Sequence, residues 1–242
     1  MRISKLQVTI NEENFSLYLG TSSLNHEILF QKRKDYLNAS ELEIFENLKF
    51  KKKRKSFLQS RHLSKNILSR YLLETDLTKL IINHGVFTQP IVNYVTNLMP
   101  TISISHTNTH TACIASSSKY PTAIDIETIS ADSKKNILSQ TTNHERKNIK
   151  HEEDENTFYT RIWTIKEALS KVLKTGITTP FSIYEINNII YTKNYTIGRF
   201  SNFSQYLAIS YHFEKHILSF VIPSSTNSQD IDKISSILSE MI

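Results

Sequence analysis

Glycine is scarce in this chain, with only 4 glycines in 242 residues. Glycine-rich phosphate loops such as GxGxxG and the Walker sequence need closely spaced glycines, because the backbone must approach the phosphate with no Cβ in the way. Neither pattern occurs in the sequence. A glycine-rich nucleotide loop is therefore excluded, and any bound phosphate must be held by side chains and helix ends.

The rest of the composition is that of a globular protein. Hydrophobic residues make up 39% and charged residues 21%, and 242 residues suffice for one large domain or two small ones. No stretch approaches the roughly 18 apolar residues that a membrane-spanning helix needs. Residues 1–15 lack the apolar core of a signal peptide, and the single cysteine, Cys113, excludes a disulfide framework. We therefore expect a cytoplasmic protein with no membrane partner.

The formal net charge is +6. A basic surface suits a nucleic acid, an anionic membrane, a phosphorylated small molecule or an acidic protein, and charge alone does not choose among them. The most basic stretch is Lys49-Phe-Lys-Lys-Lys-Arg-Lys55. Such a run usually forms a solvated helix face, but it can also bind nucleic acid. Arg61 and Lys65 follow at i, i+4 spacing and could clasp one phosphate.

Hydrophobic periodicity predicts an α+β fold. Asn38-Ala39-Ser40 starts a helical pattern, with Ser40 as the expected N-cap and a possible break near Phe50. Gly176 is the expected stop of a second long helix. Residues 79–102 are irregular, and the three strands that follow should pair antiparallel. The predicted strands are 2–10, 15–19, 102–106, 111–116, 122–129, 181–191, 195–200, 205–213 and 216–222, and the predicted helices are 41–73, one or two within 132–152, 155–174 and 229–241.

Two carboxylates alternate along the predicted strand 122–129. Ile124 and Ile126 point to one face, whereas Asp125 and Glu127 share the other. Neighbouring like charges repel and raise one pKa unless a cation relieves them, and a hard divalent cation such as Mg²⁺ suits these oxygens. A solvated strand face would show the same pattern.

A stripe of three residues runs along the predicted helix 155–174. Trp163, Glu167 and Lys171 stand at i, i+4 and i+8. Glu167 and Lys171 have the favoured orientation of a simple surface ion pair. Alternatively, Glu167 could bind a metal and Lys171 a phosphate oxygen.

Hydroxyl groups surround a histidine in Ser103-Ile-Ser-His106-Thr-Asn-Thr-His110. The spacing of His106 and His110 suits a metal pair on a helix but not across a strand and a turn. We expect His106 to act as a phosphate donor, although a structural histidine is the simpler alternative.

The order of these motifs resembles the 4′-phosphopantetheinyl transferase superfamily. A Ser-His strand is followed by Ile-Asp-Ile-Glu, and then by Trp-Thr-x-Lys-Glu-Ala-x-x-Lys, within residues 38 to 180. The chain length resembles that of the Sfp-type (surfactin-synthetase-activating) branch. This resemblance implies a pseudo-dimeric fold of two similar α/β subdomains, which we place at residues 1–115 and 116–242.

The resemblance also implies site residues and their roles. It gives the metal to Asp125, Glu127 and Glu167. It gives catalytic roles to Glu127, Glu145, Glu167 and Lys171, where Glu127 or Glu145 takes the proton. It gives contacts with coenzyme A to Arg61, Lys65, Gln89, Ser105, His106, Lys166 and Lys171, where Gln89 lies in Thr88-Gln89-Pro90 at the place of the family's Gly-Lys-Pro.

The implied reaction transfers the phosphopantetheine arm of coenzyme A to a serine of an apo acyl or peptidyl carrier protein and releases 3′,5′-ADP. The first subdomain should contact the coenzyme phosphates, and the second should carry the metal site and the catalytic helix. The implied cofactor is Mg²⁺, with Mn²⁺ as a substitute. We expect a monomer that does not bind nucleic acid.

Two alternative functions remain open from the sequence. A nucleic-acid-binding protein built around residues 49–70 would show salt-dependent binding and no response to coenzyme A. A degenerate relative would bind coenzyme A or a carrier without turnover. Ala123, where the family has glycine, and Gln89, where it has lysine, favour this second alternative, whereas the intact carboxylates and Lys171 argue against it.

Overall fold

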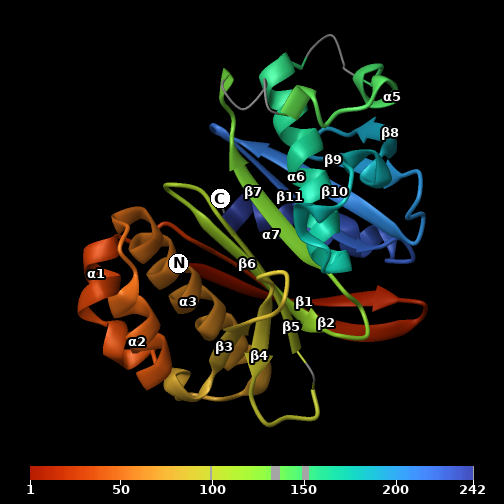
Figure 1. The fold of residues 1–242 in the computed structure, drawn as a ribbon. Coiled ribbons are helices and arrows are strands. Elements are labelled where there is room, and N and C mark those ends of the chain that lie inside the picture. The colour runs from red at the N-terminus through yellow and green to blue at the C-terminus, as the bar shows by residue number, and fades with distance from the viewer. Residues whose placement is uncertain (99, 132–136, 149–152, 242) are drawn as a thin grey trace.

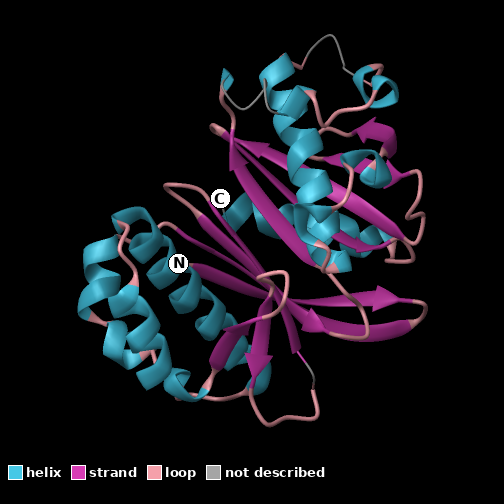
Figure 2. Ribbon diagram, in the orientation of Figure 1, coloured by secondary structure: helices cyan, strands magenta, loops and turns pink. Residues whose placement is uncertain are grey.

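The computed structural model describes residues 1–98, 100–131, 137–148 and 153–241. The chain forms two main β-sheets, and one long helix packs on each of them (Figures 1 and 2). The order of strands and helices is that of an α+β protein, which confirms the predicted fold class. Within these residues, no helix is both long and apolar enough to cross a membrane.

The first sheet has the strand order β1-β2-β6-β5. Helix α3 packs on β2, β5 and β6, and the two-stranded sheet β3-β4 lies beside β5. The elements of this half are β1 (Arg2–Ile10), β2 (Glu13–Ser22), α1 (His26–Gln31), α2 (Ala39–Asn47), α3 (Lys51–Leu72), β3 (Ile81–His84), β4 (Pro90–Asn93), β5 (Pro100–His106) and β6 (Thr111–Ser117).

The second sheet has the strand order β7-β11-β10-β9-β8. Helix α6 packs on β7, β10 and β11. The elements of this half are β7 (Ala123–Thr128), α5 (Asn143–Arg146), α6 (Glu155–Leu173), β8 (Ile186–Tyr191), β9 (Thr196–Phe200), β10 (Tyr206–Phe213), β11 (His216–Pro223) and α7 (Ser228–Met241).

The two halves repeat one topology. Strand β2, helices α2 and α3, hairpin β3-β4 and hairpin β5-β6 correspond in order to β7, α5 and α6, β8-β9 and β10-β11. In both sheets, the strand before the helices pairs with the last strand of its half. The two similar α/β units predicted from the resemblance are therefore present, although the sequence shows no repeat. Strand β1 and helix α7 stand outside the repeat and pack on each other.

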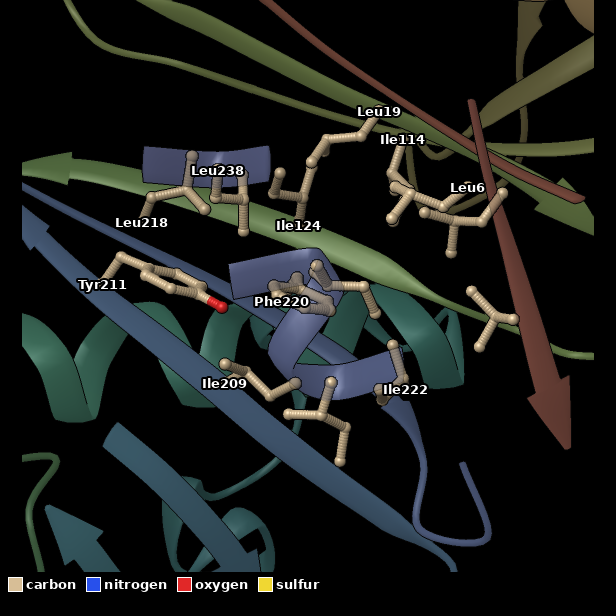
Figure 3. Packing of buried hydrophobic residues seen from close by; sticks show 14 of the residues in the cluster. Leu6, Leu19, Ile114, Ile124, Ile209, Tyr211, Leu218, Phe220, Ile222 and Leu238 are labelled. Atoms are coloured by element: carbon tan, nitrogen blue, oxygen red, sulfur yellow. The ribbon is translucent and has the colours of Figure 1, made fainter. Parts of the chain in front are cut away.

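A central apolar core joins the two halves (Figure 3). It contains side chains of β1, β2 and β6 from the first sheet, of β7, β10 and β11 from the second, and of α7. Alternate residues of β7 divide between two cores: Ile124 and Ile126 enter this central core, whereas Ala123 packs with α6. The alternation predicted for this strand is confirmed, and it turns Asp125 and Glu127 toward α6.

Four local predictions need correction. Asn38, not Ser40, caps α2, because its side chain accepts from the backbone N–H of Glu41 in a capping box. Lys174, not Gly176, ends α6 in the left-handed conformation, with φ of 56°. Residues 79–102, expected to be irregular, contain β3 and β4, and β7 pairs with β11 rather than with β6. The helices expected within 132–152 fall partly outside the described residues, and α5 is the part that is described.

Candidate functional site

Asp125 lies at the junction of the two halves. Its side chain is 5% exposed. One carboxylate oxygen, Oδ1, accepts hydrogen bonds from Ser105 Oγ at 2.7 Å and from Lys171 Nζ at 2.6 Å. The other oxygen, Oδ2, is buried and has no hydrogen-bond partner among the described residues. Strand β5 of the first half and helix α6 of the second therefore hold one oxygen of this carboxylate and leave the other free.

Glu127 and Glu167 share the electrostatic environment of Asp125. Burial and the nearby negative charge of Asp125 raise the pKa of Glu127 to about 7, although Lys171 acts in the opposite direction. The same two causes raise the pKa of Glu167 to about 7. The Trp163 side chain donates a hydrogen bond to Glu127, and its ring stacks on Phe181 at 5.1 Å between centroids. Asp125 and Lys171 thus form an ion pair, and both groups lie near enough to Glu127 and Glu167 to affect their protonation.

These carboxylates fit a hard divalent cation in their chemistry. Oε1 of Glu167, like Oδ2 of Asp125, is buried without a partner in the described part of the chain. Unpaired buried carboxylate oxygens that repel one another are the donors that Mg²⁺ prefers. Across the described ranges, no three His, Cys, Asp or Glu side chains are already gathered closely enough to hold a metal ion. The donor set is therefore suitable, while Lys171 occupies the place of a cation at Oδ1.

A cleft of about 940 Å³ opens between the two halves beside these residues. From the second half it is lined by residues of α6, including Glu167 and Lys171. From the first half it is lined by β5 and by the β3-β4 hairpin, including Ser103 and Gln89. A ligand in this cleft would contact both halves and would lie against the catalytic candidates of α6.

Gln89 lines the cleft but is also part of a tight turn. Its Oε1 accepts from the backbone N–H of Phe87 at 2.9 Å, and Thr88 between them has φ of 62°. The Gln89 side chain also lies over Gly85, where an added Cβ would meet it at 2.3 Å. The residue therefore shapes the wall of the cleft, and its polar group is engaged within the turn.

Ser105 and His106 end strand β5 in different surroundings. Ser105 donates its hydroxyl to Asp125, whereas the exposed His106 pairs only in strand register, with Thr111. His110 packs against His216, with 4.7 Å between ring centroids, rather than beside His106. This placement argues against the metal pair of His106 and His110 considered above, and it leaves His106 open to a ligand.

Arg61 and Lys65 do not match the predicted phosphate clasp. Both are buried, and both pair with Glu41: Arg61 Nε lies 3.2 Å from Oε1, and Lys65 Nζ bonds to Oε2. Lys65 also donates to the carbonyl of Tyr36 at 2.6 Å, and Arg61 to that of Ile82 at 2.9 Å. The two cations share the single carboxylate of Glu41 inside the first half, and Lys65, which is fully buried, is out of reach of a ligand.

Glu145 and Lys166 form the corresponding pair in the second half. Glu145 is fully buried, and its Oε2 accepts from Lys166 Nζ at 2.8 Å. The same carboxylate caps its own helix through Thr142 and accepts from the backbone N–H of Ile186 at 2.8 Å. A carboxylate with these three partners inside the protein does not match the prediction of a general base. Lys166, 1% exposed, does not match that of a coenzyme contact.

The two buried pairs are copies of one arrangement. Each glutamate stands at position N3 of a capping box and pairs with a lysine of the long helix. Each also accepts a hydrogen bond from the backbone N–H of a strand residue, Ile82 in the first half and Ile186 in the second. Eight residues after each lysine, at Leu73 and Lys174, the helix ends in the left-handed conformation. Sequence reasoning missed Glu41, although the capping-box pattern from Asn38 to Glu41 could have indicated it.

Comparison with known proteins gives one family match. Residues 121–222 match the model of the 4'-phosphopantetheinyl transferase superfamily, which is fewer than half of the chain. The matched range contains Asp125, Glu127, Glu167 and Lys171, but it leaves out Ser105 and the other coenzyme contacts predicted in the first half. No curated protein matches the chain.

Two solved structures are similar to parts of the chain. A holo-(acyl-carrier-protein) synthase from Bacillus anthracis str. Ames, in complex with CoA (3',5'-ADP), is 17% identical with a TM-score of 0.39, and the match covers 46% of this chain and 97% of that one. A holo-ACP-synthase from Plasmodium yoelii is 15% identical with a TM-score of 0.36, covering 48% and 97%. Values this low establish neither a shared fold nor a shared activity.

Proposed function

We propose that this protein is a 4′-phosphopantetheinyl transferase that moves the phosphopantetheine arm of coenzyme A to a serine of an acyl or peptidyl carrier protein and releases 3′,5′-ADP. The observation that carries the proposal is the convergence of Asp125, Glu127, Glu167 and Lys171 beside the cleft, within the range that matches this superfamily. The repeated α/β unit supports the Sfp-type branch.

The cleft offers the coenzyme a site between the halves. In this proposal, residues 1–115 supply the wall formed by β5 and the β3-β4 hairpin, and His106 donates to a phosphate. Residues 116–242 supply the carboxylates and Lys171. Asp125, Glu127 and Glu167 would hold Mg²⁺ or Mn²⁺, which would neutralise charge on the pyrophosphate. We do not carry Arg61, Lys65, Glu145 and Lys166 into this site, because each is buried and has an ion-pair partner in the interior.

The side chains of the site have separate tasks in the transfer. Glu127 is suited to take the proton of the carrier serine, directly or through water, because a base works best when its pKa is near the working pH. Lys171 would stabilise the charge that develops on the leaving phosphate. Positioning and electrostatics dominate phosphoryl-type transfers, so a pocket shared by two rigid halves is an appropriate scaffold.

The basic run supports an acidic partner. Lys51, Lys52 and Lys53 are exposed in the first turn of α3. Positive charge there opposes the helix dipole, and a docked anionic surface would relieve it. Carrier proteins are typically acidic, and such complementarity speeds encounter. We propose a cytoplasmic monomer that binds the carrier rather than nucleic acid. Salt-dependent DNA or RNA binding without a response to coenzyme A would favour the nucleic-acid alternative.

The direct test is a transfer assay. The purified protein is incubated with coenzyme A, Mg²⁺ and a panel of apo-carriers, and the added arm is read by intact mass. Wild type should modify at least one carrier. Asp125→Asn and Glu167→Gln should lose transfer by about 100-fold or more while keeping the fold by circular dichroism. Glu155→Gln, an exposed position on the same helix, is the control. Near-normal transfer by both site variants would refute the metal assignment.

A further inference from the structure

Lys171 makes its contacts at the seam of the two halves. Its Nζ donates to Asp125 Oδ1 at 2.6 Å, to the carbonyl of Ile124 at 3.2 Å and to that of Ile104 at 3.4 Å. Ile104 belongs to edge strand β5 of the first sheet, and Ile124 to edge strand β7 of the second. The ammonium group is therefore surrounded by one carboxylate and two carbonyl oxygens, a set of donors that also suits a metal cation.

The carboxylates around the Lys171 ammonium group can carry more negative charge than that one group neutralises. Asp125, Glu127 and Glu167 together carry three potential charges against the single charge of Lys171. Oδ2 of Asp125 and Oε1 of Glu167 are buried without a hydrogen-bond partner among the described residues. The site can therefore accept a further positive charge.

The cleft offers Lys171 a second position, away from Asp125. Its side chain is 27% exposed and lines the cleft. The paired lysines at Lys65 and Lys166 are buried, with exposures of 0% and 1%. At the corresponding helix position of the first half, Arg70 follows Lys65 by five residues, as Lys171 follows Lys166. Arg70 donates to the carbonyl of Ile3 at 2.9 Å. The ion pair to a carboxylate is thus a feature of the second half.

We propose that Lys171 is an internal counter-ion that competes with the divalent cation for Asp125 and moves to the coenzyme pyrophosphate when both ligands bind. This inference rests on the proposed function. The three N–H donors of Lys171 are taken by Asp125 and by the carbonyls of Ile104 and Ile124, so contact with a phosphate requires the side chain to leave at least one of them. The cation, which competes for Asp125, and the coenzyme then both favour the released arrangement of Lys171. Two ligands that favour the same state bind with positive cooperativity.

The test measures Mn²⁺ binding by electron paramagnetic resonance in the absence of coenzyme A. Lys171→Gln removes the competitor and should bind Mn²⁺ about tenfold more tightly than wild type, since the free-carboxylate state is then always populated. Lys174→Gln removes one positive charge from the same cleft without touching Asp125, and its affinity should stay within about twofold. Equal affinity of wild type and Lys171→Gln would overturn the proposal.

A second measurement follows the wild-type protein, in case Lys171→Gln does not fold, and uses a variant only to assign the signal. The ¹⁵N-labelled ammonium signal of Lys171, assigned by its loss in Lys171→Arg, should shift when diamagnetic Mg²⁺ is added, and shift again with coenzyme A. A signal that stays unchanged at saturating Mg²⁺ would refute the exchange.

Failure of this inference differs from failure of the proposed function. If wild type modifies a carrier but Lys171→Gln binds Mn²⁺ no more tightly, the enzyme assignment stands and the exchange is wrong. If Lys171→Gln binds Mn²⁺ more tightly but no carrier is modified, the exchange stands and the transferase assignment is wrong.

Discussion

Glu167 links the charge of the site to the stability of the protein. Its pKa is raised from 4.5 to about 7 by burial and by Asp125. Between these values the folded protein holds a proton that the unfolded chain has released. Stability therefore falls as pH rises through this window, because the slope has the sign of the protons bound when unfolded minus those bound when folded.

The resulting prediction compares wild type with Glu167→Gln in urea denaturation from pH 4.5 to pH 8 with a chelator present. The free energy of unfolding of wild type should fall relative to the variant as pH rises toward about 7. Saturating Mn²⁺ at the upper end should raise it again, because the cation binds only the deprotonated carboxylates. A difference between the two proteins that is independent of pH would contradict this prediction.

The sequence predicted which face the strand carboxylates occupy, but it did not predict which groups the lysines pair with. Period-two alternation put Asp125 and Glu127 on one face because strand geometry alone decides that question. The i, i+4 rule suggested a surface pair of Glu167 and Lys171, but Lys171 bonds to Asp125 instead. Lys65 and Lys166 have partners from helices 24 and 21 residues earlier in the chain. No local pattern reports which distant group meets a side chain.

At the scale of elements, the buried glutamate–lysine pairs fix each long helix to its half. Burial lowers the pKa of Lys65 and of Lys166, while the paired glutamate opposes that change. Removing one partner leaves an uncompensated charge in the interior, which costs far more than the pair contributes as a whole. A single substitution in either pair should therefore destabilise the packing of the whole helix.

We predict that Glu145→Gln lowers the free energy of unfolding by about 3–5 kcal/mol. Glu41→Gln should have an effect of the same order, because it breaks the equivalent pair. The control is Glu46→Gln, which removes the two ion pairs of an exposed glutamate, with Arg33 and Arg54, and should change stability by less than about 1 kcal/mol. If Glu145→Gln instead keeps full stability and loses only transfer activity, Glu145 is the general base after all.

The sequence predicted element boundaries well where a periodic pattern extends over many residues, and poorly where the strands are short. The helix pattern 41–73 with a break at Phe50 matches α2 and α3, since Phe50 is the N-cap of α3. Strands β3 and β4 have four residues each and lie among Gly85, Pro90 and Pro100, so the turn signals concealed them. The pairing of β7 with β11 depends on the whole sheet, and a local reading of three successive strands misplaced it.

At the scale of the molecule, two edge strands meet where the halves join. The side chain of Ser103 on β5 forms hydrogen bonds from one sheet to the other. Its Oγ accepts from the N–H of Ile124 on β7 at 3.1 Å and donates to the carbonyl of the same residue at 3.3 Å. Ser103 is 5% exposed, so water is a poor substitute for these bonds. One hydroxyl therefore satisfies the backbone of the residue next to Asp125.

We predict that Ser103→Ala lowers stability by about 1–3 kcal/mol, because it removes the acceptor of the buried backbone N–H of Ile124, whereas the carbonyl of Ile124 keeps its bond from Lys171. The same variant should weaken Mn²⁺ binding, since Asp125 follows Ile124 directly on β7. Thermal unfolding and the Mn²⁺ titration check the two effects. Ser118→Ala, at an exposed turn, should change stability by no more than about 0.5 kcal/mol. Unchanged melting of Ser103→Ala would show that the seam does not depend on this hydroxyl.

The position of the cleft between the halves bears on how the protein survives proteases. The two α/β units share a central core, so loosening of either unit exposes backbone, and such partly open forms are the ones that proteases cut. A ligand seated against β5, the β3-β4 hairpin and α6 together is lost when either unit opens, so it depopulates every partly open form at once. If the proposed coenzyme is that ligand, the protein should resist proteolysis more strongly as coenzyme concentration rises.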